Sequence, residues 1–136
     1  MKVSWLAILS ALVAQQILGF CWYSRGLFAE PWLEGIGKRP EDLQPSAGPF
    51  ILATVAAVLL PLGVAWIVHK THLRGVKAGA LIGFGVSLFF IAPAVLVHEA
   101  FLGYPPLVLA IDASKEIVGG IIVGAIVGAW PRRNSA

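Results

Sequence analysis

The sequence predicts an all-α protein, a bundle of four transmembrane helices, on two observations. Apolar residues make up 58% of the chain and charged residues 12%, with a mean hydropathy of +0.84. A soluble domain carries roughly 25% charged residues, so this chain has too little charge to cover a globule in water. The apolar residues also fall into four stretches, each close to the roughly 20 residues that cross a bilayer. We expect one integral membrane domain over residues 1–136, surrounded by the lipid bilayer, with spans at about 3–22, 50–68, 78–97 and 107–130.

Charge and cysteine content exclude several other classes of protein. The net charge is +3, but the basic residues lie in short loops beside the apolar stretches, where they orient a membrane protein. No nucleic-acid motif accompanies them, so we expect no nucleic-acid partner. The single cysteine, Cys21, excludes an internal disulfide and a thiolate metal cluster. His69 and His72 have an i,i+3 spacing that suits a metal, but no carboxylate or cysteine lies near them in the sequence. We therefore expect two solvated loop histidines, and neither a metal nor a cofactor in the protein. A metal site at these histidines is the alternative.

The first span, at about 3–22, contains two polar residues. A cleaved signal peptide is the alternative for this stretch, but its apolar run exceeds the roughly 7–15 residues of a typical signal core. Gln15 and Gln16 lie inside the span. At least one of them should point into the bundle, because an unpaired amide that faces lipid is costly.

An aromatic loop follows the first span. Trp and Tyr prefer the membrane–water interface, where the ring is partly hydrated. The sequence therefore predicts an interfacial loop between the first two spans, with the anchors Trp22, Tyr23 and Trp32. Proline suits the first turn of a helix, so we also expect short helices at 31–36 and from Pro40.

The later spans contain residues that bend helices or let them approach closely. Pro61 removes a backbone hydrogen bond near the middle of the second span and should kink it, and Pro93 should bend the far end of the third. His98 and Glu99 then close the third span. Glycines four residues apart favour close helix contacts; they are Gly79, Gly83, Gly120, Gly124 and Gly128. They can serve the bundle itself or a homo-oligomer, and we expect a homo-oligomer through these glycine-rich faces.

The basic residues predict the orientation. Four spans place both termini on one side of the membrane. Six basic residues flank the spans on that side: Lys2, Lys70, Arg74, Lys77, Arg132 and Arg133. Three flank them on the other side: Arg25, Lys38 and Arg39. The positive-inside rule then places both termini in the cytoplasm, and the expected location is a bacterial inner membrane.

The fourth span contains three ionisable residues, Asp112, Lys115 and Glu116. With a rise of about 1.5 Å per residue, Asp112 lies roughly 8 Å and Glu116 roughly 14 Å below the outer boundary. The other polar residues expected near this depth are Gln15, Gln16, His98 and Glu99. A charged side chain at the centre of a span costs about 2.5–3.5 kcal/mol on the insertion scale. This face of the span must therefore be buried against other helices or reached by water.

Two interpretations of this stretch are open. Asp112 lies three residues before Lys115 and four before Glu116, so all three can lie near one face of a helix. Two acids and one lysine leave a net negative site that a proton, a cation or another donor must complete. One interpretation is an internal salt bridge, completed by a glutamine, that fixes the helix register. The other, which we prefer, is a proton, ion or ligand site, because ionisable residues inside a membrane are by default candidates for function.

Two stretches resemble a known bacterial membrane family. The first is Gly-Phe-Cys-Trp-Tyr-Ser at 19–24, which continues through Leu-Phe at 27–28 to Pro-Trp at 31–32; the second is Leu-Ala-Ile-Asp-Ala at 109–113, which continues to Gly-Ala-Ile-Val-Gly-Ala-Trp at 124–130. Together they resemble the family catalogued as "domain of unknown function 1761" over nearly the whole chain. The resemblance implies a small four-helix inner-membrane protein without an assigned activity, whose family positions are Trp22, Tyr23, Trp32 and Asp112. The sequence departs from the family pattern at Lys115 and Glu116, where the family has an aromatic residue and a histidine, so Asp112 is the stronger site candidate.

These observations leave three classes of function. The first expectation is a proton- or cation-linked transport or permeation module with a polar site in the outer half of the bundle. Asp112 and Glu116 would accept the proton or cation, Lys115 would be the counter-charge, and the two glutamines would line the cavity. The second class is a membrane-embedded enzyme or lipid-ligand binder that also uses His98 and Glu99; no strong catalytic signature supports an enzyme. The third is a structural or accessory subunit, in which the charges only fix helix register.

Overall fold

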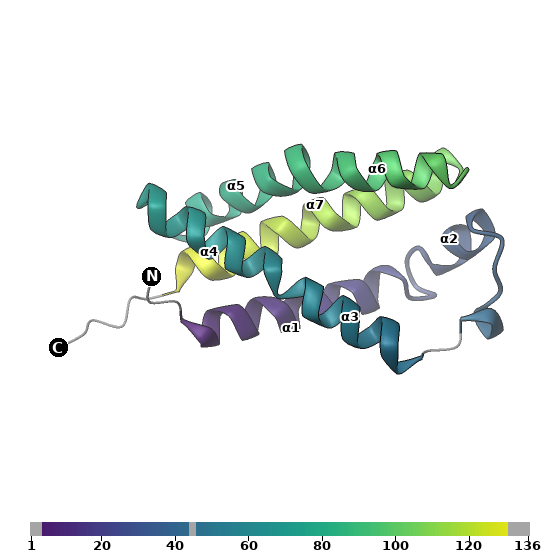
Figure 1. The fold of residues 1–136 in the computed structure, drawn as a ribbon, viewed down its shortest axis with the longest axis horizontal. Helices are drawn as coiled ribbons and strands as arrows, with labels where there is room; N and C mark the ends of the chain where they lie inside the picture. Colours follow the sequence, from purple (N-terminus) through teal and green to yellow (C-terminus); the bar gives the residue numbers. More distant parts are fainter. Residues whose placement is uncertain (1–3, 44–45, 131–136) are drawn as a thin grey trace.

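The structure of the chain is a computed structural model that describes residues 4–43 and 46–130. All the regular elements in this part of the chain are helices, and the longer ones lie lengthwise beside one another (Figure 1). The predicted all-α class is confirmed. The first residue of the predicted first span and the basic residues Lys2, Arg132 and Arg133 lie outside the described residues.

Within residues 4–43 and 46–130, three helical segments are long and apolar enough to cross a membrane. The first is α1 (Trp5–Trp22), and the second joins α3 (Ala47–Ala57) to α4 (Leu59–Thr71). The third joins α5 (Val76–Val86), the π-helical segment η2 (Ser87–Ile91) and α6 (Ala92–Phe101). The last helix, α7 (Pro106–Ala129), is 24 residues long, and the three ionisable residues in its first half distinguish it from these apolar segments.

The second and third segments extend beyond the predicted spans at both ends. At the C-terminal ends, the helices continue to within two residues of a residue in a left-handed conformation, His72 (φ 58°) and Gly103 (φ 77°). His69, expected in a loop, therefore lies in the last turn of α4. His98 and Glu99 likewise lie within α6 and do not mark the end of the helix.

The two prolines perturb their helices as expected, in different ways. Val58 separates α3 from α4 three residues before Pro61, which has no N–H to bond to the carbonyl of the preceding turn. The N–H of Val58 donates to the carbonyl oxygen of Val55 at 3.2 Å, so the helix is interrupted about one turn before Pro61. Pro93 follows the π-helical segment η2, where the wider turn accommodates the missing hydrogen bond.

Two contact zones hold the bundle together. Apolar side chains of α1, α4 and α7 form the core: Ala11, Val64, Val68, Val123 and Val127. On the other side of α7, the predicted glycines let α5 approach closely, since a Cβ added to Gly83 would lie only 1.8 Å from the carbonyl oxygen of Gly120. The glycine faces thus join two helices of the same chain. The homo-oligomer expected through these faces remains a prediction.

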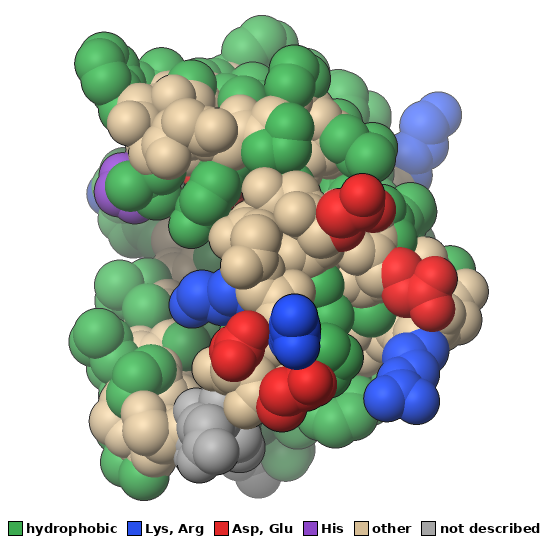
Figure 2. Space-filling model, turned by 90° about the vertical axis from the view of Figure 1, so that its right-hand side faces the viewer, with side chains coloured by type: hydrophobic (Ala, Val, Ile, Leu, Met, Phe, Trp, Pro, Cys, Tyr) green, Lys and Arg blue, Asp and Glu red, His purple; other side chains and the backbone are tan. Residues whose placement is uncertain are grey.

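The short helices α2 (Ala29–Gly35) and η1 (Pro40–Asp42) lie between α1 and α3. The second begins at Pro40 as predicted, whereas α2 begins two residues before Pro31 and ends at Gly35. Gly35 brings α2 against the start of α7, because a Cβ at this position would lie 2.3 Å from Cγ2 of Val108. Figure 2 looks onto this end of the molecule and shows acidic and basic side chains gathered over it. The turn that connects α1 to α2 therefore lies directly above the polar residues of α7.

Candidate functional site

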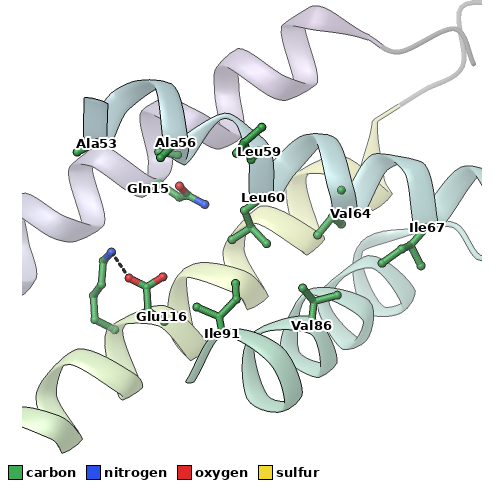
Figure 3. A pocket seen from close by; sticks show the side chains of 13 residues that line it. Gln15, Ala53, Ala56, Leu59, Leu60, Val64, Ile67, Val86, Ile91 and Glu116 are labelled. Carbon is green, nitrogen blue, oxygen red and sulfur yellow. Dashed lines mark hydrogen bonds and ion pairs between the residues drawn. The ribbon is translucent and has the colours of Figure 1, made fainter. Parts of the chain in front are cut away.

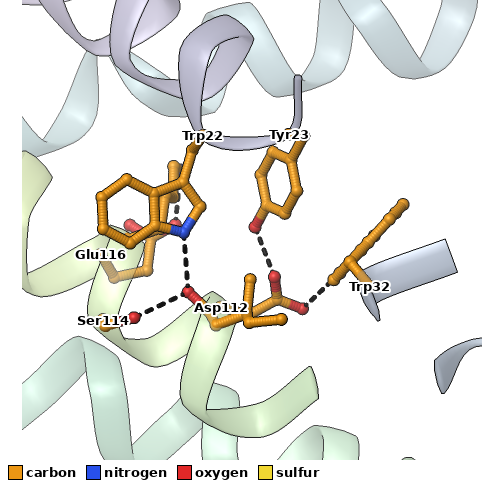
Figure 4. Close-up of polar contacts among 8 residues, drawn as sticks. Trp22, Tyr23, Trp32, Asp112, Ser114 and Glu116 are labelled. Atoms are coloured by element: carbon orange, nitrogen blue, oxygen red, sulfur yellow. Dashed lines mark hydrogen bonds and ion pairs between the residues drawn. The ribbon is translucent and has the colours of Figure 1, made fainter. Parts of the chain in front are cut away.

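Asp112 lies in the second turn of α7 and accepts hydrogen bonds on both oxygens of its carboxylate (Figure 4). The hydroxyl of Tyr23 donates to Oδ1, and the indole Nε1 of Trp32 donates to Oδ2 at 3.0 Å. Tyr23 directly follows α1, and Trp32 belongs to α2. One half-buried carboxylate thus connects the end of α1, the short helix α2 and α7.

The rest of the aromatic loop also packs onto α7. The indole Nε1 of Trp22 donates to the backbone carbonyl of Ile111 at 3.1 Å, next to Asp112. The rings of Tyr23 and Trp32 pack against each other with centroids 5.0 Å apart, as do those of Trp22 and Phe28. The three residues expected to anchor the protein at the interface are therefore hydrogen-bond donors to α7. Sequence reasoning missed this role, although the resemblance already grouped them with Asp112.

Tyr23 is a donor with a fixed proton. Burial, and after it the hydrogen bond to Asp112, raises the pKa of Tyr23 well above its ordinary value. The phenol is therefore neutral at physiological pH and is the donor in its bond to Asp112. A bond from a neutral hydroxyl to an ionised carboxylate is about twice as strong as one between neutral groups.

Glu99 brings a second carboxyl group to the same place. It lies in the last turns of α6, close enough to Asp112 for the two carboxyl groups to interact electrostatically. Its Oε2 atom is fully buried and has no hydrogen-bond donor among the described residues. His98, which the sequence placed beside it, is exposed. Of these two predicted residues, the structure brings Glu99 to Asp112 and leaves His98 at the surface of α6.

Lys115 and Glu116 form a separate polar group one turn further along α7. Lys115 Nζ lies 2.7 Å from Glu116 Oε1, so in the described chain the lysine pairs with its neighbour and not with Asp112. Gln15 of α1 projects into the same cleft as Glu116 (Figure 3). Gln16 is exposed and does not line this cleft, which agrees with the expectation that at least one glutamine points inward.

The predicted site thus divides into two parts, each with residues of α7. The first part is the carboxyl pair of Asp112, whose donors come from the aromatic loop, and Glu99 of α6. Gln15, Lys115 and Glu116 form the polar end of a cleft of about 600 Å³ whose remaining walls are mainly aliphatic. The first part can hold a proton, because two carboxyl groups in contact avoid mutual repulsion when one of them is protonated. The second part carries no net charge when the lysine and glutamate are both ionised.

Comparison with known protein families matches most of the chain to one family model. The family model described as "Protein of unknown function (DUF1761)" matches residues 6–128, which include all the site residues named above. No curated protein and no solved structure matches the chain. The aromatic loop and the Asp112 segment lie inside the matched region.

Proposed function

This chain belongs to the DUF1761 family of proteins of unknown function, and from the geometry of its own site we propose that it is a four-span membrane protein with a proton-linked transport or permeation role. The proton-binding group is the Asp112–Glu99 pair in the outer half of the bundle. The observation that carries the proposal is the buried Glu99 oxygen that lies beside Asp112 without a donor among the described residues.

Partner contacts support α7 as the fourth span. Its 24 residues give a length of about 36 Å, enough for a hydrocarbon core of about 30 Å. All three of its ionisable residues have partners: Lys115 pairs with Glu116, and Asp112 accepts two hydrogen bonds. These contacts reduce the cost of placing charges in the membrane. With four spans, the excess of basic residues favours cytoplasmic termini in a bacterial inner membrane.

The contacts of Asp112 support proton binding at Glu99. Tyr23 and Trp32 already donate to the two oxygens of Asp112, and neither can supply a second proton to Glu99. A protonated Glu99 donates its own O–H to Asp112 and removes the repulsion between the two groups. A small cation between the two carboxylates is the alternative that the transport assay distinguishes.

The same contacts support a link between proton binding and movement. When Asp112 is ionised, charge-assisted hydrogen bonds from Tyr23 and Trp32 hold the aromatic loop on α7. A proton that arrives at Asp112 weakens both bonds together. The aromatic loop then separates more easily from α7, which opens the pair toward the outer side. Protonation of one carboxyl group thus controls access to the site.

A proteoliposome assay tests this proposal. We expect a pH gradient to drive proton entry that an internal pH-sensitive dye detects, and we expect Asp112→Asn and Glu99→Gln to slow it at least tenfold. The exposed Glu34 of α2 gives a matched control, and Glu34→Gln should keep the wild-type rate. Sodium or potassium dependence of the rate would indicate a cation in place of the proton. A rate in Asp112→Asn equal to that of the wild type, in a variant that folds normally, would refute the proposal.

We also propose that more than one copy forms the pathway, because four helices of one chain enclose little space. Since Gly79, Gly83, Gly120 and Gly124 already join α5 to α7, the contact between copies has to use another surface. Crosslinking of the protein in native membranes tests this point: a ladder of dimers or larger species supports it, and a monomer alone refutes it.

A further inference from the structure

We propose that the cleft between α3, α4 and α7 binds an uncharged amphiphile whose head carries carbonyl oxygens, the chemistry of a prenylated quinone. The site is distinct from the Asp112–Glu99 pair and does not depend on proton transport. The proposal concerns binding only and includes no transfer of electrons.

The walls of the cleft suit the apolar part of such a molecule. The volume of about 600 Å³ is within the roughly 300–1,000 Å³ that small-molecule sites occupy. Aliphatic residues of α3, α4 and η2 line it, among them Ala56, Leu60, Val64 and Ile91 (Figure 3). These side chains offer no hydrogen bond, so they fit a hydrocarbon tail or the face of a ring.

The opposite wall carries three polar side chains, Gln15, Lys115 and Glu116. The lysine and glutamate side chains keep 25% and 28% of their surface exposed, so the ion pair is not sealed and a bound molecule can reach it. A hydrocarbon chain alone would surround these N–H and O groups with apolar atoms, and burying polar groups without hydrogen bonds costs free energy. The occupant therefore has a polar head.

Charge and depth require that head to be neutral. Lys115 and Glu116 cancel each other, so neither an anion nor a cation gains a net attraction. Glu116 is ten residues beyond the start of α7, about 15 Å along the helix and near the middle of a bilayer. A charged headgroup at that depth would lose its hydration, and phospholipid headgroups stay at the surface for this reason.

Free N–H groups of the wall can bind carbonyl oxygens of the ligand. A lysine ammonium has three N–H groups, and only one is needed for the bond to Glu116 at 2.7 Å. The amide of Gln15 adds two more. Carbonyl oxygens accept hydrogen bonds from such N–H groups and bring no charge to the site.

The α3 side of the cleft has room to adapt to an occupant. None of the described residues of α3 is buried, and the helix is separated from α4 by the interruption at Val58. A rigid-body adjustment of α3 about Val58 therefore disturbs little packing. An occupant would supply the apolar contacts that α3 lacks on its inner side.

Photolabelling of the full-length protein in nanodiscs tests the site. The probe is a benzoquinone with a decyl tail that carries a diazirine, and mass spectrometry locates the adducts. We expect adducts in the α3–α4 region that lines the cleft, and competition by unlabelled decyl-benzoquinone. Gly63→Leu should reduce labelling at least tenfold, because Gly63 lines the cleft and a Cβ added there meets no described atom within 4 Å. Gly85→Leu is the matched control, since Gly85 is equally open but lies outside the cleft.

Each outcome decides the proposal. The double variant Lys115→Met/Glu116→Gln removes the polar contacts with the head of the probe, and labelling about tenfold weaker than in the wild type supports the proposal. Equal labelling by a diazirine-bearing alkane without the quinone head would show that the cleft holds lipid chains only, and would overturn it. Labelling unchanged in Gly63→Leu would overturn it as well. Asp112→Asn should leave labelling intact, so failure of the proton site and failure of this site are distinguishable.

Discussion

Replacing Gly83 by alanine should force α5 away from α7. The added Cβ would lie 1.8 Å from the carbonyl oxygen of Gly120, 2.7 Å from its carbonyl carbon and 3.1 Å from Cα of Gly124. All three are backbone atoms, so no side-chain rotation relieves the clash. A close carbon–oxygen contact needs about 3.3 Å, and the helices must therefore separate by about 1.5 Å. Overpacking of this kind typically costs about 1–3 kcal/mol, and the contact with rigid backbone puts Gly83→Ala at about 3 kcal/mol.

Gly85→Ala is the matched control on the same helix. A Cβ at Gly85 has no described atom within 4 Å, and alanine favours a helix over glycine by about 1 kcal/mol. This variant should be neutral or slightly more stable than the wild type. Unfolding by titration with SDS, followed by circular dichroism, compares the two. Equal midpoints for Gly83→Ala and Gly85→Ala would refute the glycine contact between α5 and α7.

Three further predictions follow from the polar contacts. Tyr23→Phe removes one donor from Asp112 and should lower the free energy of unfolding by about 1–1.5 kcal/mol, near the upper end for hydrogen bonds in membrane bundles. The same substitution should lower it much less in an Asp112→Asn background, because the bond is already altered there. Equal losses in both backgrounds would refute the bond. Because the pKa of Tyr23 is raised, its contribution to stability is complete below the unfolded pKa of about 10 and is lost as the pH rises through the folded pKa. The tyrosinate absorbance that distinguishes wild type from Tyr23→Phe should therefore appear above pH 10, and a separate step at pH 10 would contradict the burial of the phenol. Lys115→Met leaves Glu116 without its partner and should lower the free energy of unfolding by about 1–3 kcal/mol in the same assay. The double variant Lys115→Met/Glu116→Gln should recover most of this loss. A double variant as unstable as the single one would show that the broken ion pair does not cause the loss of stability.

The fold was largely predictable because each element depends on local properties of the sequence. Length and hydropathy locate the apolar segments, and the missing N–H of Pro61 locates the helix interruption. Glycine spacing predicts close helix contacts but does not say which helices make them. Helix ends were less predictable. His72 takes a left-handed conformation that glycine usually supplies, so no residue type indicated that α4 reaches Thr71.

The candidate site was predictable in its residues and only partly in its pairing. Asp112 stands out because it is a charge in an apolar helix. Its actual donors, Tyr23 and Trp32, are 80 or more positions away in the chain, and no spacing rule reports such a contact. Helical spacing allowed Asp112, Lys115 and Glu116 to lie near one face, and it did not predict that the flexible lysine side chain turns to Glu116. The contact of Glu99 with Asp112 depends on how α6 packs against α7, which the sequence does not specify.

The central claim is that one proton is held between Glu99 and Asp112. Infrared spectroscopy of the protein in lipid at neutral pH tests it most directly, because a protonated carboxyl group has a carbonyl band separate from those of carboxylates. We predict this band in the wild type and in the control Glu34→Gln, and its loss in Glu99→Gln. A wild-type spectrum without the band, or a band that persists unchanged in Glu99→Gln, would contradict the account.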